Sequence, residues 1–542
     1  MRSLFSKYEE VQDAEVSNFI SSIPSTFSSS VKMLLSSSFI IRNENNSVLG
    51  NRTELKKYVN EFHYEAKTNT EKVSYSCNLL SDPATEILVS IHQPNLFAYS
   101  GVFKKMILSQ AIKRSVEEKN SKKKVIDLFL IVDHDFMDDV WIRIAQLPSI
   151  HHSDGILELR LPVSNSNRWR MVSQMPLPNH TLLHFWKRQI NSWIRISTSE
   201  SKNIDKRTLI NNFEEFWQQV ETAYAKAKTY SDFNSFLMSQ VVNNVWNYDT
   251  LFVKLSRLSP VFREGFNYLL ANFDIYSKSL RKAQTAFLHH GIQTGVSSTS
   301  YLYSPLWLHC KCGSKASVKI KKNGKQLELD GICMSCKKEL QLNIGNESRI
   351  DICEESVSNL SPRAIPILLL LCRELGVSNF VSGTGGSMGY TIVSSMVFRE
   401  LGIDMPRVVL WPSSDIYLGI AQSEAMDVLK LKQRSHIQTY LDELKAQNAE
   451  YEKKIKPFII ERKRKVKENE PLQTLLSNLF DLKEQQRKIR QSIKIAQKVS
   501  NALALKACFI DYAVNFGIVQ TEKIWHKNLL NSESLDSPVV MT

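Results

Sequence analysis

Short apolar runs that end abruptly in polar clusters recur along this chain, and each run predicts a buried strand. The first run covers 87–91 and stops at the polar sequence 92–95, where Pro94 prevents its continuation as a central strand. A second run covers 125–132, and apolar residues at helical spacing from about Gly101 onward lie between the two runs. The pattern therefore predicts a strand, a loop, a helix and a second strand.

Two later runs, near 379–381 and 408–411, predict two more strands. The first of them turns through a glycine-rich segment into a helix that ends near Glu400. Strands that alternate with helices indicate a parallel sheet with right-handed crossovers. We therefore expect an α/β fold with a Rossmann-like parallel-sheet core over 86–425, whose ligands bind beyond the carboxyl ends of the strands.

Outside this core the hydrophobic pattern changes. Residues 1–85 are expected to be mainly helical. A helical insertion rich in tryptophan and phenylalanine is expected over 170–300, and a small cysteine-bearing module over 305–345. Residues 426–542 are expected to form a helical arm and a C-terminal tail.

The arm is predicted from its spacing of apolar residues. This spacing alternates between four and three on both sides of the sequence Asn-Glu-Pro at 469–471, which indicates an antiparallel coiled-coil hairpin joined by a proline turn. We expect Pro457 to kink or interrupt the first helix. The residues in the two repeats are Ile437, Leu441, Leu444, Asn448, Tyr451, Ile455 and Phe458, then Leu472, Leu475, Leu479, Leu482, Gln486, Ile489, Ile493 and Ala496.

Composition limits the class of protein. The chain has 542 residues, of which 43% are hydrophobic, so wholesale disorder and collagen-like repeats are excluded. The formal net charge is +14, with basic patches at 119–124 and 453–467, which suits either a polyanionic or nucleotide partner or a solvated lysine-rich face. No secretory signal is visible, and the longest apolar run, 365–372, is too short to span a bilayer. We expect a cytoplasmic protein with no membrane partner.

Two close cysteine pairs predict a metal site. Cys310 and Cys312 precede Cys333 and Cys336 by about twenty residues, and a short β-prone segment lies between the pairs. Four thiolates at such spacing bind zinc tetrahedrally in structural sites. His309 would give the more usual spacing to Cys312, so either His309 or Cys310 is the first ligand.

Polar groups at the ends of the first two strands are candidates for catalysis. A neutral imidazole after the first strand could donate to a phosphate or stabilise charge on a leaving group. Two carboxylates after the second strand should project to the same side, which suits an amine, a ribose or a magnesium ion. The alternative roles are the capping of backbone groups and turn formation. These residues are His92, Gln93 and Asn95 after the first strand, and Asp133, His134 and Asp135 after the second.

The glycine-rich segment is a candidate phosphate loop. The chain has only 18 glycines, yet four of them lie within seven positions, between the third strand and its helix. Glycines there let backbone amides approach a phosphate at the helix N-terminus. The segment is neither a Walker loop nor a dinucleotide fingerprint at its usual first strand. The candidate residues are Gly383, Thr384, Gly385, Gly386 and Ser387, and Gly389 completes the cluster.

Taken together, these motifs resemble the BshC family, the cysteine ligases of bacillithiol synthesis. The features shared in order are the sequence at 92–96, the run Asp-His-Asp-Phe at 133–136, Ser-Pro-Arg at 361–363, the sequence at 401–406 and the terminal coiled coil. They extend over roughly residues 50–515. The resemblance implies a Rossmann-like core related to class I aminoacyl-tRNA synthetases and a helical arm that mediates homodimerisation.

The resemblance also implies an activity, the joining of the cysteine carboxylate to the amine of a glucosaminyl-malate, with ATP and magnesium as expected substrates. The glycine loop would hold phosphates, and His92 and Gln93 would steady developing charge. Asp133 or Asp135 would bind or deprotonate the amine, with His134 as the reserve acid–base group. Activation could give an adenylate or an acyl phosphate.

Two other classes of function fit the sequence. A zinc ribbon, a basic coiled coil and a synthetase-like core also suit a tRNA- or RNA-binding or nucleotide-binding protein without ligase activity. The third class is a scaffold whose arm dimerises an inactive core. The acidic residues retained at the strand ends favour an active core over a scaffold.

Overall fold

The computed structural model describes residues 2–36, 46–199, 205–383 and 386–541. Within them, the central sheet has five strands in the order β13–β12–β1–β2–β5, and every neighbouring pair is parallel. The expected α/β class with a parallel sheet is therefore confirmed. The strands are β1 (Glu86–His92), β2 (Val125–Ile131), β5 (Leu251–Lys254), β12 (Asn379–Val381) and β13 (Arg407–Val409).

Both faces of the central sheet are buried, which explains the continuous apolar runs of its strands. Successive side chains point to opposite faces, so Ile87 and Val89 join one core cluster and Leu88 joins the other. The helices on the Leu88 face include α3 (Phe27–Leu35), α6 (Ser100–Lys119), α8 (His180–Ser197), α9 (Lys206–Lys226) and α10 (Tyr230–Ser239). Those on the other face include α1 (Arg2–Glu9), α2 (Ala14–Ser22), α4 (Asn46–Glu65), α5 (Glu71–Asn78), α11 (Arg263–Ala271), α12 (Phe273–His289), α14 (Ala364–Leu375) and α15 (Gly386–Glu400).

The segment between β2 and β12 is more than a helical insertion. After the short helix α7 (Val140–Arg143) it forms an antiparallel pair, β3 (Ile144–Pro148) and β4 (Ile156–Arg160). The expectation of helix over 170–300 is wrong at β5, which pairs with β2 and forms an edge of the central sheet. With only four residues, β5 is too short to stand out from the apolar helices around it.

The cysteine module belongs to a second, antiparallel sheet. In the described part of the chain this sheet has six strands, in the order β10–β9–β8–β7–β6–β11. The sheet extends beyond the 305–345 expected for the module, because its outer strands come from residues after 345. The strands are β6 (Leu306–His309), β7 (Lys315–Asn323), β8 (Gln326–Cys333), β9 (Glu339–Asn346), β10 (Arg349–Ile350) and β11 (Leu360–Pro362).

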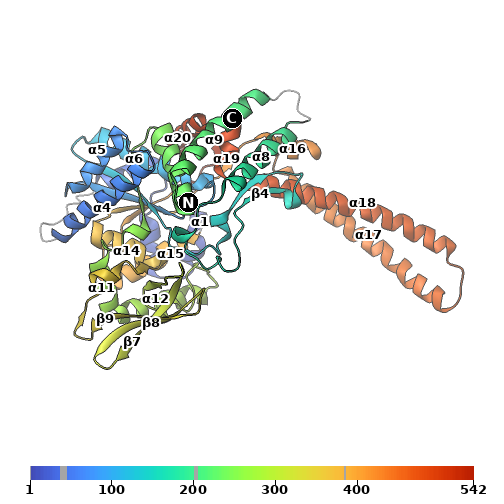
Figure 1. The fold of residues 1–542 in the computed structure, drawn as a ribbon. Coiled ribbons are helices and arrows are strands. Elements are labelled where there is room, and N and C mark those ends of the chain that lie inside the picture. Colours follow the sequence, from blue (N-terminus) through green and yellow to red (C-terminus); the bar gives the residue numbers. More distant parts are fainter. Residues whose placement is uncertain (1, 37–45, 200–204, 384–385, 542) are drawn as a thin grey trace.

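Two long helices, α17 (His436–Lys467) and α18 (Gln473–Ala504), form a hairpin that projects far from the rest of the molecule (Figure 1). Predicted seam residues such as Leu441 and Leu479 are buried along it. Of the kink or interruption expected at Pro457, the interruption is wrong, because α17 continues through this residue.

The tail after the arm packs back onto the core. Its helices α19 (Phe509–Phe516) and α20 (Ile518–Asn531) contact α9 and α6. Its last strand, β15 (Val539–Val540), pairs with β14 (Asp415–Ile416), which follows β13. The arm is therefore inserted between two parts of the core rather than appended to its end.

Gly389 in the first turns of α15 is required by close packing. A Cβ atom at this position would lie 2.2 Å from the backbone oxygen of Thr294. This contact accounts for one of the four clustered glycines without any ligand.

We expect Gly389→Ala to lower the free energy of unfolding by about 1–3 kcal/mol, because the backbone at Thr294 must shift. Gly50→Ala in α4 is the matched control, since no atom lies within 4 Å of its added Cβ. Urea denaturation followed by circular dichroism measures both variants. Equal stability of the two variants would contradict the packing role.

Candidate functional site

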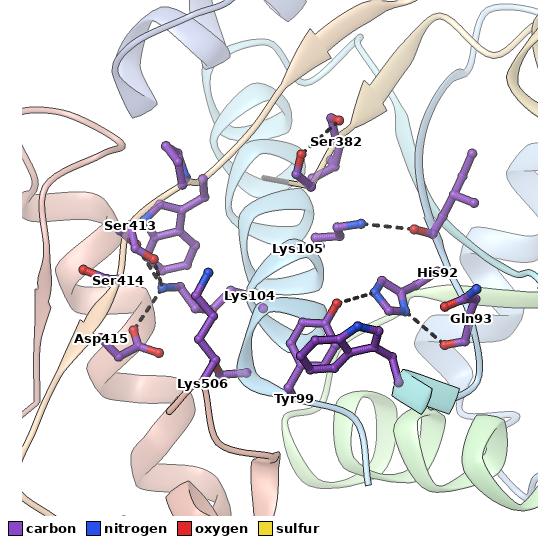
Figure 2. A pocket seen from close by; sticks show the side chains of 18 of the residues that line it. His92, Gln93, Tyr99, Lys104, Lys105, Ser382, Ser413, Ser414, Asp415 and Lys506 are labelled. Carbon is purple, nitrogen blue, oxygen red and sulfur yellow. Dashed lines mark hydrogen bonds and ion pairs between the residues drawn. The ribbon is translucent and has the colours of Figure 1, made fainter. Parts of the chain in front are cut away.

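A cavity of about 690 Å³ lies at the carboxyl ends of β1, β12 and β13. It borders the boundary between β1 and β12, where the strand order reverses, since β2 and β5 follow β1 on one side and β12 and β13 lie on the other. Ligands of open parallel sheets bind in the crevice that such a reversal creates. Residues drawn in Figure 2 as lining the cavity include His92, Gln93, Tyr99, Lys104, Lys105, Ser382, Ser413, Ser414, Asp415 and Lys506.

Lys104 on the first turns of α6 is buried in an ion pair. Its Nζ lies 2.9 Å from Asp415 Oδ1 and donates to the backbone oxygen and Oγ of Ser413, both at 2.9 Å. The ammonium also lies over the Trp411 ring, 4.7 Å from its centroid. Burial lowers the pKa of Lys104, and the Asp415 carboxylate opposes that shift. Lys104 therefore joins α6 to the segment after β13.

Lys105 is buried beside it in a different environment. Its Nζ donates to the backbone oxygen of Ile91 at 3.1 Å (Figure 2), and no carboxylate of the described chain forms an ion pair with it. Burial lowers the pKa of Lys105 to about 8. A buried ammonium without a counter-ion is costly unless a ligand supplies the negative charge. Lys105 is thus the group in this cavity best placed to bind an anion.

The C-terminal region also supplies cavity residues. Arg434 and Lys506 lie on its lining, so four cations face it together with Lys104 and Lys105. Tyr512 of α19 donates to Asp415 Oδ2 at 2.9 Å. None of these groups is predicted from the sequence to be functional, because nothing local distinguishes a lysine that will face a cavity from one on the surface.

His92 lies in the cavity wall, and both its ring nitrogens are engaged. Nδ1 is 3.0 Å from the Gln93 backbone oxygen, and Nε2 is 3.0 Å from the Tyr99 hydroxyl. A carbonyl oxygen only accepts, so Nδ1 carries the proton and Nε2 accepts from Tyr99. Burial, together with the charge of Lys105, lowers the pKa of His92 to about 3. The ring is neutral as expected, but in this arrangement its proton is not available to a phosphate.

Gln93 and Asn95 have separate roles. The Gln93 amide lies between two carboxylates, with Nε2 2.6 Å from Asp135 Oδ2 and 3.4 Å from Asp139 Oδ2. Asn95 is buried and donates to the Trp141 backbone oxygen at 2.6 Å. It is not among the cavity-lining residues. Gln93 therefore contributes to the cavity, whereas Asn95 fixes the loop that follows β1.

The expectation that Asp133 and Asp135 project to the same side is wrong. Asp133 is buried against the β5 side, where it accepts from the Ser256 backbone nitrogen at 2.9 Å and from Ser256 Oγ at 2.6 Å. Burial raises the pKa of Asp133, although Lys254 opposes the shift. Asp135 lines the cavity instead. Asp133 is therefore held by Ser256 in a structural position, and Asp135 is the candidate catalytic carboxylate.

His134 faces a neighbouring cavity rather than the main one. Its backbone oxygen accepts from Lys315 Nζ at 2.6 Å. Its Nδ1 is buried without a hydrogen-bond partner. Burial and the charge of Lys315 hold the pKa of His134 well below its usual range, so the ring is neutral.

The glycine-rich segment is described only in part. Gly383 lines the cavity, and Gly386 and Ser387 begin α15, whose N-terminus points a helix dipole toward the carboxyl end of β12. Thr384 and Gly385 lie outside the described residues. The predicted strand and helix on either side of these two residues are present as β12 and α15, and β12 pairs with β1.

The four cysteines come together as predicted. Cys310 Sγ lies 3.6 Å from Cys336 Sγ, and Cys312 Sγ lies 3.5 Å from Cys333 Sγ. All four sulfur atoms are within 4.8 Å of one another. Metal–sulfur bonds of about 2.3 Å at tetrahedral angles place sulfur atoms about 3.8 Å apart, so the cluster could hold a metal ion.

His309 is excluded from this cluster by its contacts. Its Nε2 lies 2.9 Å from Ser361 Oγ in β11. The set of residues close enough to share a metal contains Cys310 and not His309. The choice that the sequence left open is therefore settled in favour of Cys310.

Comparison of the chain with protein-family models and with curated proteins finds no match. Among the described residues, no helix is both long and apolar enough to cross a membrane.

We expect the purified chain to contain about one metal ion, measured by inductively coupled plasma mass spectrometry, because four thiolates form a closed site. Cys310→Ser should lower the metal content, since three ligands hold the ion less tightly. His309→Gln is the control and should keep full metal content. Loss of metal in His309→Gln with retention in Cys310→Ser would contradict the assignment.

Proposed function

We propose that the cavity at the carboxyl ends of β1 and β12 binds a nucleoside triphosphate. The observation that carries this proposal is Lys105, a buried cation with no carboxylate partner in the described chain, at the reversal of strand order. Three more cations line the same cavity, and the N-terminus of α15 adds a favourable dipole for phosphate. The strand order also supports the Rossmann-like core implied by the resemblance to the BshC family.

The base of the nucleotide has a candidate partner at the cavity wall. Trp141 lines the cavity, and its side chain is 60% exposed. An exposed indole offers a flat apolar surface on which a purine can stack. In this proposal Lys105 binds the phosphates and the base stacks on Trp141.

We propose an ATP-dependent carboxylate–amine ligase as the function that this site supports best. ATP activates the carboxylate of one substrate as an adenylate, with loss of pyrophosphate, or as an acyl phosphate, with loss of ADP. The amine of the second substrate then attacks the acyl carbon, and AMP or phosphate leaves. Lys104 and Lys105 offset negative charge on the phosphates, and Asp135 accepts the proton that the attacking amine loses. By resemblance to the BshC family, the carboxylate is that of cysteine and the amine that of a glucosaminyl-malate.

We propose that ATP binds as its magnesium complex. The carboxylates of Asp135 and Asp139 lie on either side of the Gln93 amide, and both line the cavity. Carboxylate oxygens are ligands that magnesium prefers. For the cysteine cluster we propose zinc in a structural role, because four thiolates leave no open position.

We further propose that the arm is a coiled coil that pairs two copies of the chain. Phe480 near its turn is 70% exposed, and Ile460 is 60% exposed. The RNA-binding alternative rests on basic residues of the same arm, at 453–467. The binding and ligation experiments below distinguish an ATP-dependent ligase from that alternative.

We expect Lys105→Met to weaken binding of magnesium-ATP about 10- to 100-fold, because a charge-assisted hydrogen bond in a buried site is worth about 1.5–3 kcal/mol. Lys119→Met at the exposed end of the same helix is the control and should bind as the unmodified chain does. Isothermal titration calorimetry at fixed ionic strength measures each affinity. Unchanged affinity in Lys105→Met would rule out this phosphate site.

The same binding should depend on pH. Burial lowers the pKa of Lys105 to about 8, so the ammonium that attracts phosphate is lost as the pH rises through that value. Affinity for ATP should therefore be constant between about pH 6.5 and 7.5 and fall between about pH 8 and 9.5. Lys105→Arg should remove this fall, because its guanidinium stays charged. A fall that persists in Lys105→Arg would assign the titration to another group.

A ligation assay tests the activity itself. The chain is incubated with magnesium-ATP, cysteine and glucosaminyl-malate, with other amines in parallel, and products are identified by mass spectrometry. Asp135→Asn should lower turnover at least tenfold, whereas Asp138→Asn, which does not line the cavity, should be active. Release of AMP or of ADP identifies the activation step. Absence of product and of nucleotide turnover with every amine, with tight tRNA binding at low salt, would favour the RNA-binding alternative.

A further inference from the structure

A second cavity, of about 860 Å³, adjoins the first. It lies between the start of α14, strands β7 and β8 of the antiparallel sheet, and the segment 295–303. Asp135 and Tyr390 line both cavities, so they form a shared wall. The hydroxyl of Tyr390 donates to the Gly295 backbone oxygen at 2.9 Å, which holds this wall in place. A molecule in the second cavity can therefore approach Asp135 from the side opposite the nucleotide.

Arg363 is the central polar group of the second cavity. Its guanidinium carbon lies 4.0 Å from the centroid of the Trp307 ring and 5.4 Å from that of Tyr303. Nε donates to the Ser304 backbone oxygen at 2.9 Å, while the terminal nitrogen NH2 is buried and has no hydrogen-bond partner. Within the described chain, no carboxylate forms an ion pair with Arg363. The planar guanidinium of Arg363 is thus held by two aromatic rings, and one of its nitrogens has no hydrogen-bond acceptor.

The charges around Arg363 leave the cavity positive. Lys319 lies over the Tyr303 ring at 5.6 Å, with no ion pair in the described structure. Lys321 is already neutralised, since its Nζ lies 2.6 Å from Asp330 Oδ2. Burial lowers the pKa of Arg363 to about 10, so the group stays charged near neutral pH. Lys319 is exposed to solvent, so the partly buried guanidinium of Arg363 is the charge that favours an anionic ligand.

His134, which lines the same cavity, also has a buried nitrogen without a hydrogen-bond partner. His134 is 2% exposed, its Nδ1 has no hydrogen-bond partner, and its ring is neutral. Each of these two nitrogens can form one hydrogen bond with a polar group of a ligand. These two unsatisfied groups are an observation independent of the shape of the cavity.

We propose that the second cavity is the binding subsite for a small substrate that carries both a carboxylate and an amine, with Arg363 holding the carboxylate and Asp135 receiving the amine. The planar guanidinium between aromatic rings matches a carboxylate better than a tetrahedral phosphate. The inference rests on the proposed function, since it assigns the second substrate of that reaction to a place beside the nucleotide. It makes Arg363 a determinant of substrate specificity.

Binding of succinate to the full chain tests the carboxylate subsite, with succinamide as the uncharged probe and inorganic phosphate as the competing anion. Isothermal titration calorimetry should detect millimolar or tighter binding of succinate, at least fivefold weaker binding of phosphate, and none of succinamide. Arg363→Gln should weaken succinate binding at least tenfold, and Arg363→Lys should restore only part of it. Lys321→Gln removes the same charge from the same cavity but should bind as the unmodified chain does, since Asp330 already neutralises that lysine.

A second variant keeps the test valid if Arg363→Gln does not fold. Ile332→Trp places a bulky ring in the cavity lining at a residue that is 58% exposed, without touching Arg363. It should weaken succinate binding and leave ATP binding unchanged. Absence of succinate binding to the unmodified chain at 10 mM, about the weakest affinity the assay resolves, would overturn the inference. So would equal binding of succinamide, or binding of phosphate as tight as that of succinate.

The two proposals fail in different ways. Succinate binding that is lost in Arg363→Gln, in a chain that binds no ATP, would support the subsite and refute the nucleotide site. ATP binding without succinate binding would support the nucleotide site and refute the carboxylate subsite. Lys105→Met gives an internal check, because it should weaken ATP binding and leave succinate binding unchanged.

Discussion

The structure depends on the pairing of β1 with both of its parallel neighbours. β2, next along the chain after α6, takes one side of β1, and β12, almost three hundred residues later, takes the other. Because the three strands are parallel, the segments that follow them meet at one edge of the sheet. The cavity, Gly383 and the two lysines of α6 lie at this edge for that reason.

The cysteine cluster and the cavity are joined by a short chain of backbone contacts. The Gly313 backbone oxygen accepts from the Met171 nitrogen at 2.9 Å, and the neighbouring Val172 nitrogen donates to the Asp135 oxygen at 2.9 Å. Lys315, three residues after Cys312, donates to the His134 oxygen. A metal held by the cysteines would therefore stiffen the loop that carries Asp135.

The C-terminal segment that follows the arm also contributes to this edge of the sheet. Asp415 is bound by Lys104 from α6 and by Tyr512 from α19, so three segments distant in sequence meet at one carboxylate. The chain leaves the core for the arm after β14 and re-enters the core at α19, directly after the arm. A movement of the arm relative to the core would therefore displace Lys506 and Tyr512, which line the cavity.

The sequence by itself determined the local features: the apolar strands, the polar clusters that end them, the paired cysteines and the long helical arm. Each is set by the composition and spacing of a short segment, which is why β1, β2 and the arm lie where the pattern predicts. The proposed activity and its nucleotide rest on the resemblance in sequence together with the chemistry of the first cavity, and the proposed second-substrate site rests on the chemistry of the second cavity.

Only the tertiary structure decided which polar groups share a cavity. A lysine such as Lys105 has the same local pattern whether it faces solvent or a buried crevice, because its environment comes from β1 and β12 rather than from α6. Asp133 and Asp135 are two residues apart, yet hydrogen bonds from Ser256, more than a hundred residues later, hold Asp133 away from the cavity. Similarly, His309 Nε2 contacts Ser361 Oγ, and His309 is not among the residues that could hold the metal ion. The sequence sets what each segment can form, and long-range packing sets which side chains meet.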